Sequence, residues 1–179
     1  MPRYVALLRG INVGGNRRVA MADLRALLSG LGYTDVRTHL QSGNAVFTSL
    51  AAKPEALARQ IENGLLDELG LTVRCLIRSS DELHAVIDGN PLGAVATDGS
   101  KMIVLFLSER PDPTLLAAHD PADLAPAEIR IGDRVIYQWC PDGLLASPPV
   151  AGFVEKYLKV TVTARNWNTV TKLGALLDG

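Results

Sequence analysis

Two halves of the chain show the same order of predicted strands and helices, and this order narrows the choice of fold more than any other feature. In the first half, apolar periodicity predicts strands at 4–8, 36–40, 45–49 and 71–78 and helices at 21–31 and 54–69. In the second half, the same kind of pattern predicts strands at 102–107, 129–131, 134–140 and 160–163 and helices at 113–119, 152–158 and 167–177. Each half therefore has the order βαββαβ, which is typical of a ferredoxin-like unit.

The predicted fold class is α+β, with two ferredoxin-like (βαββαβ) subdomains in tandem, packed as one compact body. Residues 1–88 would form the first subdomain with a trailing helix, and residues 101–179 would form the second, with the order βαββαβα. The connector is expected at 89–100, where Asp-Gly-Asn-Pro opens a glycine-rich stretch. The halves share no evident sequence repeat, so a single mixed α+β sheet is the alternative.

Local signals support several of these boundaries. Pro54 is a favoured first-turn residue of a helix, and Gly70 is a favoured helix end. Ser79 precedes Glu82 by three residues, which is the spacing of a capping box. The pair Gly132-Asp133 predicts a two-residue hairpin turn of type II′.

The composition of the chain narrows the partners and cellular locations that can be expected for it. The 179 residues carry a formal net charge of −1, so the chain has no overall basic field for nucleic acid, although a local basic patch is left open. No stretch reaches the ~18 apolar residues that a membrane span needs. The two cysteines, Cys75 and Cys140, form no CxxC motif, so we expect unbridged thiols without metal in a reducing compartment. These observations predict a cytoplasmic protein with no membrane partner, metal or cofactor.

The stretch RGINVGGN, directly after the first strand, is the first candidate site. Loops of this kind either connect a strand to a helix or aim backbone N–H groups at an anion. Its glycines match neither GxGxxG nor GxxxxGK[ST]. Arg9 ends an apolar strand and is a candidate ligand, whereas Arg18 is expected on a solvated face. The ligand-binding candidates in this loop are Arg9, Gly10, Asn12, Gly14, Gly15 and Asn16.

Two further polar segments are candidates. Gln41, Ser42 and Asn44 lie in a turn between two predicted strands, and they either turn the chain or present polar groups to a ligand. Arg165, Asn166 and Trp167 open the last predicted helix, where Asn166 or Asn168 can cap it and Trp167 can pack in the core or stack on a ring. His39, close to the Gln41 turn, is the histidine of most interest, but catalytic residues are not evident.

Three stretches together resemble the bacterial domain-of-unknown-function (DUF) family numbered 1697. They are ALLRGINVGGNRRVAMADLRALLSGLGYTDVRTHLQSGNAVF, then NPLG, then PDG with TARNWNTVTKL. One departure is Ala20, where relatives commonly have proline. The resemblance implies two related α+β subdomains and no particular activity. Its signature is mainly polar and glycine-rich, which favours a shared site over a packing role.

Three functions compete on these grounds. The first is binding of an anionic, phosphorylated or nucleotide-like ligand in a cleft formed by the Arg9–Asn16 loop, the Gln41–Asn44 turn and the Arg165–Trp167 helix start. The second is an enzyme acting on a phosphorylated small molecule in the same cleft, for which the sequence offers no evident general base or nucleophile. The third is an RNA-binding module, an analogy drawn from the fold. The oligomeric state is not predicted.

Overall fold

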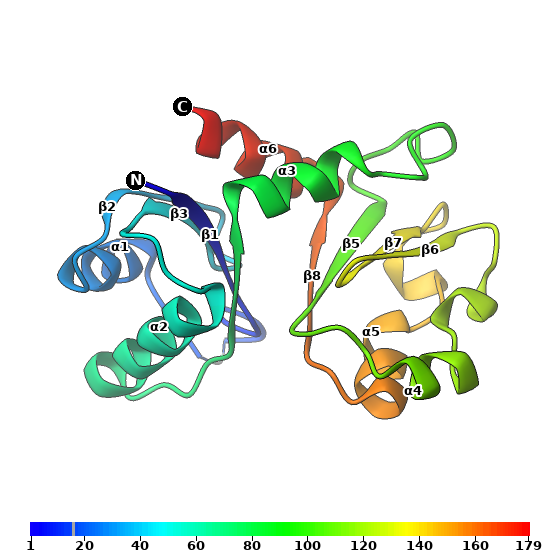
Figure 1. Ribbon diagram of the computed structural model, residues 1–179, viewed down its shortest axis with the longest axis horizontal. Coiled ribbons are helices and arrows are strands. Elements are labelled where there is room, and N and C mark those ends of the chain that lie inside the picture. Colours follow the sequence, from blue (N-terminus) through cyan, green and yellow to red (C-terminus); the bar gives the residue numbers. More distant parts are fainter. Residues whose placement is uncertain (16) are drawn as a thin grey trace. The chain divides into compact units, whose positions relative to one another are not determined.

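The computed structural model describes residues 1–15 and 17–179, and it divides into two units. Unit 1 comprises Met1–Ala85 with Lys172–Gly179, and unit 2 comprises Val86–Thr171. Each unit contains one four-stranded sheet in which every neighbouring pair of strands is antiparallel. Figure 1 labels the strands and helices of each unit.

Unit 1 has the βαββαβ order that the sequence predicts. Its elements are β1 (Arg3–Leu8), α1 (Met21–Gly30), β2 (Thr34–His39), β3 (Asn44–Thr48), α2 (Pro54–Leu69), β4 (Cys75–Ser79) and the beginning of α3 (Ser80–Asp88). The strand order across the sheet is β2-β3-β1-β4. The first strand thus lies between the third and the fourth, which is the ferredoxin-like arrangement.

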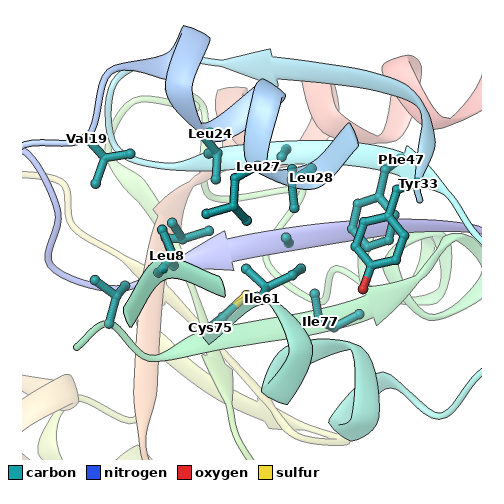
Figure 2. Close-up of a cluster of buried hydrophobic side chains, with 14 of the residues drawn as sticks. Leu8, Val19, Leu24, Leu27, Leu28, Tyr33, Phe47, Ile61, Cys75 and Ile77 are labelled. Carbon is teal, nitrogen blue, oxygen red and sulfur yellow. The ribbon is translucent and has the colours of Figure 1, made fainter. Parts of the chain in front are cut away.

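One face of this sheet is covered by α1 and α2, because both helices carry an apolar stripe. Alternate residues of β1, which point to the same face, join buried residues of both helices in one hydrophobic core. Figure 2 shows Leu24 and Leu27 of α1 gathered with Ile61 of α2 over the strands that carry Leu8 and Phe47. This packing fixes the ends of β1 and α1, and the glycine loop connects those ends.

The predicted helix boundaries of unit 1 are largely confirmed. Pro54 opens α2, and Gly70 ends it in the left-handed conformation, with φ of 66°. The capping box at α3 is present in both directions. The Ser79 N–H donates to Glu82 Oε2 at 2.8 Å, and the Glu82 N–H donates to Ser79 Oγ at 3.1 Å. These signals are local, which is why the sequence alone was enough to find them.

Unit 2 repeats the arrangement with shorter helices. Its elements after α3 are β5 (Met102–Leu107), α4 (Pro113–Ala118), the 3-10 helix η1 (Pro121–Leu124), β6 (Ile129–Gly132), β7 (Val135–Trp139), the 3-10 helix η2 (Leu144–Ala146), α5 (Val150–Phe153), the π-helix η3 (Val154–Leu158), β8 (Val162–Asn166) and the beginning of α6 (Trp167–Asp178). The strand order is β6-β7-β5-β8, equivalent to that of unit 1. The predicted α+β class with two ferredoxin-like subdomains is confirmed, and the single mixed sheet is wrong.

Two local predictions in unit 2 are wrong by a few residues. Gly132 pairs with Val135 across the hairpin, so the turn residues are Asp133 and Arg134, with Arg134 at a φ of 54°. The last strand, β8, extends to Asn166 and pairs with β5. Arg165 therefore belongs to a strand and does not open the helix. Pairing with β5 decides this boundary, and such pairing is not visible in the local sequence.

The end of α6 belongs to unit 1. Arg3 donates a hydrogen bond to the Leu177 carbonyl, and Arg37 donates to a main-chain oxygen of Gly179 at 3.2 Å. His84 Nε2 lies 2.8 Å from Asp178 Oδ1. The first unit thus includes residues from both ends of the sequence. The domain limits proposed from the sequence, 1–88 and 101–179 with a connector at 89–100, stay a prediction.

No described helix is both long and apolar enough to cross a membrane.

Neither cysteine forms a disulfide and both are buried, as predicted, with 5% of Cys75 and none of Cys140 exposed. Burial also raises the pKa of the Cys140 thiol, which lowers its reactive thiolate fraction. We therefore expect neither thiol to react readily with a thiol reagent in the native protein, and both to react in denaturant. Fewer than two reactive thiols in denaturant would contradict this account. Stoichiometric zinc in a metal analysis would contradict the separate prediction that the thiols hold no metal.

Candidate functional site

The glycine loop between β1 and α1 has an unusual backbone. Gly14 and Gly15 have φ of 61° and 78°, a region that L-residues adopt rarely. A Cβ at Gly14 would have no neighbour within 4 Å, and one at Gly15 would meet only a guanidinium nitrogen of Arg18. Backbone conformation, and not close packing, therefore explains why these two positions are glycine. Asn16, one of the predicted ligand contacts, lies outside the described residues.

Asn12 closes this loop with its side chain. The Asn12 Nδ2 donates to the Val19 carbonyl at 2.9 Å and to the Gln41 carbonyl at 2.6 Å, and its Oδ1 accepts from the Val19 N–H at 2.9 Å. The Asn12 N–H also donates to the Arg17 carbonyl at 3.1 Å. Both amide protons of the side chain are thus used within the protein. These bonds make Asn12 a brace between the loop and the turn, and its predicted role as a ligand contact stays a prediction.

The turn at Gln41–Asn44 is held by a second asparagine. Asn44 is completely buried, and its Nδ2 donates to the His39 carbonyl at 2.7 Å and to Ser42 Oγ at 3.0 Å. The side chains of Gln41 and Ser42 are exposed. Asn44 therefore shapes the turn from inside, while Gln41 and Ser42 face solvent.

Gly43 brings the turn against the loop. Its carbonyl accepts from the Leu8 N–H at 2.9 Å. Its φ is 92°, and an added Cβ would lie 2.8 Å from Ile11 Cδ1 and 2.9 Å from Leu8 Cβ. The turn can approach the end of β1 so closely only because this residue has no side chain.

The loop and the turn border a hollow of about 440 Å³ on the surface of unit 1. Its described lining consists of Asn12, Gly15, Arg18, Val19, Ala20 and Gln41. Arg18 is exposed, and its Nε donates to the Gly15 carbonyl at 3.3 Å. Within the described part of the chain Arg18 forms no ion pair. Its positive charge is therefore not neutralised by a neighbouring carboxylate.

Helix α1 begins at this hollow without a side-chain cap. Its N-cap residue is Ala20, which has no oxygen to accept a bond from the first-turn N–H groups. The positive end of the helix dipole adds to the charge of Arg18. Asp23, an exposed residue of the first turn, partly opposes both. The described charges at this end of α1 are thus the Arg18 guanidinium and the helix dipole on one side and the Asp23 carboxylate on the other.

The predicted site residues are brought together only in part. Asn12, Gly15 and Gln41 line the hollow, but Arg9 is not among its described lining. Arg9 is exposed, and its N–H donates to the Arg74 carbonyl at 2.9 Å. Arg18 is exposed, as expected for a residue on a solvated face, and it also lines the hollow. Its position two residues before the N-cap of a helix was the signal in the sequence that could have identified it.

The Arg165–Trp167 segment belongs to unit 2. Arg165 lies opposite Val104 in the sheet, and its NH1 donates to the Ala164 carbonyl at 2.9 Å. Asn166 caps α6, since its Oδ1 accepts from the Thr169 N–H at 2.9 Å. Trp167 is half-buried, so it is not part of the closed core. That this segment and the glycine loop contribute to one site stays a prediction.

The geometry bears on metal binding and on sheet-face RNA binding. Among residues 1–15 and 17–179 there is no group of three His, Cys, Asp or Glu side chains that could hold a metal ion. RNA-binding sheets of this fold stack bases on exposed aromatic side chains. Here the strand aromatics Tyr4, Phe47, Phe106 and Tyr137 are buried. Trp139, at the end of β7, is half-buried. A sheet with so few accessible rings disfavours that mode.

Comparisons with known proteins agree with the fold. A solved structure of a conserved bacterial protein from Streptococcus pneumoniae is similar over 98% of both chains, with a TM-score of 0.68 and 24% sequence identity. At that identity the likeness extends to the fold alone. No curated protein matches the sequence. The family model of DUF1697 matches residues 1–137. The chain therefore belongs to DUF1697, a family of proteins of unknown function.

Proposed function

We propose that the protein binds a small anionic ligand, phosphorylated or nucleotide-like, in the hollow between the glycine loop and the Gln41–Asn44 turn. The observation that carries this proposal is the position of Arg18. Its unneutralised guanidinium and the uncapped start of α1 border the same hollow of about 440 Å³. Pockets for small molecules commonly span ~300–1,000 Å³, so the space suits a ligand of this class.

The chemistry of the lining favours an oxyanion over a neutral ligand. A guanidinium matches the geometry of a phosphate or carboxylate group and can donate two parallel hydrogen bonds to it. The uncapped N–H groups of α1 point along the helix axis toward negative charge. Asn12 and the positive-φ glycines would hold the loop in one conformation. Binding would then cost little conformational entropy, because the loop would already be ordered.

Arg9, Arg165 and Trp167 are kept in the proposal as further ligand contacts. Arg9 is exposed and Arg165 is half-buried. Arg9→Ala and Arg165→Ala are expected to leave folding nearly intact, because removing an arginine that lies outside the core typically costs about 1 kcal/mol or less. A loss of ligand binding in either variant would support its role. An Arg9/Arg165 double variant that unfolds would instead identify these arginines as structural.

The direct test is a thermal-shift titration with pyrophosphate, AMP and ATP. A ligand at about one hundred times its dissociation constant adds ~2.7 kcal/mol of stability, which a shift in Tm detects. Arg18→Gln is expected to raise the Kd of the best of these ligands at least ~10-fold, because one charge-assisted hydrogen-bonding group is lost.

Arg110→Gln is the matched control, because Arg110 is also exposed but forms a 2.7 Å ion pair with Asp133 in unit 2. It should retain the wild-type Kd. Equal losses in both variants would show a nonspecific effect of net charge, and an unchanged Kd in Arg18→Gln would refute the proposed site.

The prediction of a bacterial cytoplasmic location is kept with this proposal, and cell fractionation would check it. No described arrangement favours the enzyme alternative over simple binding.

A further inference from the structure

The hollow beside Arg18 is larger and more apolar than a bare oxyanion needs. Its volume is about 440 Å³, of which a single phosphate group fills only a small part. The surface of its described lining is mainly apolar, and Gly15, Val19 and Ala20 contribute no polar side-chain group to it. Apolar surface is stabilised by removal from water against another apolar surface, and a charged group alone does not provide that. A ligand that fills this space therefore has an apolar part as well as an anionic group.

Two exposed apolar residues flank the hollow at the hydrogen bond between Asn12 and Gln41. Val13 follows Asn12 in the chain, and Leu40 precedes Gln41. The Asn12 Nδ2 lies 2.6 Å from the Gln41 carbonyl oxygen, so the two lining residues are in contact. Val13 is 66% exposed and Leu40 is 55% exposed. Each of these two lining residues thus has an apolar neighbour that is largely in water and that a ligand can cover.

Leu40 is held at this place by the hairpin between β2 and β3. His39 and Asn44 are paired across the hairpin, and the Asn44 Nδ2 donates to the His39 carbonyl at 2.7 Å. Leu40 begins the connection with φ of 62°, a conformation that asparagine adopts more readily than leucine. Backbone preference therefore does not account for a leucine here, and packing accounts for little of it because most of the residue is exposed. Contact with a ligand would account for it.

The Gln41 side chain supplies a polar group at the same place. It is exposed and lines the hollow. Asn12 bonds the backbone carbonyl of Gln41, and within the described part of the chain the Gln41 carboxamide forms no hydrogen bond. A carboxamide has donors and an acceptor side by side, which matches the adjacent donor and acceptor sites on the edge of a nucleobase.

We propose that the ligand of this hollow is a nucleoside phosphate, whose phosphate binds at Arg18 and whose base packs against Val13 and Leu40. This inference rests on the anion site proposed above and names the class of molecule that carries the anion. A flat base buries a large apolar area with few rotatable bonds, and the Gln41 carboxamide bonds its polar edge. Phosphorylated sugars and inorganic polyphosphates have no such ring, so they would leave Val13 and Leu40 in water.

The test compares AMP with ribose 5-phosphate by isothermal titration calorimetry at constant ionic strength. Both ligands carry the ribose and the phosphate, so the difference between their Kd values reports the base. We expect AMP to bind about 10-fold more tightly. Leu40→Asn and Val13→Thr should each raise the AMP Kd about 5-fold and the ribose 5-phosphate Kd by much less. Both variants should fold, because asparagine tolerates a positive φ and threonine keeps the branched shape of valine.

Leu66→Asn is the matched control, because Leu66 of α2 is 50% exposed and is not in the described lining of the hollow. It should leave both Kd values unchanged. Equal Kd values for AMP and ribose 5-phosphate in the wild type would overturn this inference and leave the anion site standing. An AMP Kd that neither Leu40→Asn nor Val13→Thr changes would contradict the placement of the base. If AMP, ribose 5-phosphate and pyrophosphate all failed to bind, the anion site itself would be wrong, and the nucleoside phosphate with it.

Discussion

Gly43→Ala is expected to lower the free energy of unfolding by about 3 kcal/mol, the largest effect of any single methyl group added at the site. Two costs combine. The φ of 92° is strained for any residue with a Cβ, and that Cβ would meet Ile11 Cδ1 at 2.8 Å and Leu8 Cβ at 2.9 Å. Chemical denaturation of the purified variant measures the loss.

Gly14→Ala is the matched control for this prediction. Its φ of 61° is also positive, but an added Cβ would meet nothing within 4 Å. It should therefore lose only the backbone term, about 1 kcal/mol. If both variants lost the same amount, the close approach of the turn to β1 would be wrong.

Asn12→Ala is expected to cost about 2–3 kcal/mol of stability and to open the glycine loop. The substitution removes the side-chain bonds to both the N–H and the carbonyl of Val19 and to the carbonyl of Gln41. It also puts alanine at a φ of 55°, where asparagine is better tolerated. Hydrogen exchange at the Val19 amide should accelerate together with the loss of stability.

Gln41→Ala is the control for the brace, because Asn12 bonds the Gln41 backbone carbonyl and not its side chain. The Gln41 side chain is exposed, so its removal should lower the free energy of unfolding by less than ~0.5 kcal/mol. Wild-type protection of the Val19 amide in Asn12→Ala would contradict the assignment of Asn12 as a brace.

The sequence predicted those parts of the fold that depend on local interactions. Apolar periodicity located β1 and β5, and the Ser79–Glu82 capping box located the start of α3. The element order was enough for two ferredoxin-like units, since a βαββαβ segment with two apolar helix faces has few other ways to bury them.

What the sequence missed depends on contacts between distant residues. The extension of β8 through Arg165 follows from pairing with β5, and the attachment of the end of α6 to unit 1 follows from bonds made by Arg3 and Arg37. Neither has a local signature.

The sequence identified the segments that border the hollow but not what each of their side chains does. The glycine loop and the Gln41 turn do border one hollow, but two of their asparagines, Asn12 and Asn44, are engaged in holding the backbone. A polar side chain in such a loop can hydrogen-bond the backbone or contact a ligand, and the sequence alone does not show which of the two it does. Arg18 was expected on a solvated face, and its side chain is exposed. That it also lines the hollow depends on the fold of the loop, which its flanking position in the sequence does not reveal.

The central claim is that the hollow beside Arg18 binds an anion, and an NMR titration of the labelled protein with pyrophosphate tests it most directly. The account predicts saturable shifts of the Gly15, Val19 and Ala20 amides, with a Kd that rises at least ~10-fold in Arg18→Gln and stays unchanged in Arg37→Gln. Amides of this hollow that do not shift, or that shift equally in the wild type and in Arg18→Gln, would contradict it.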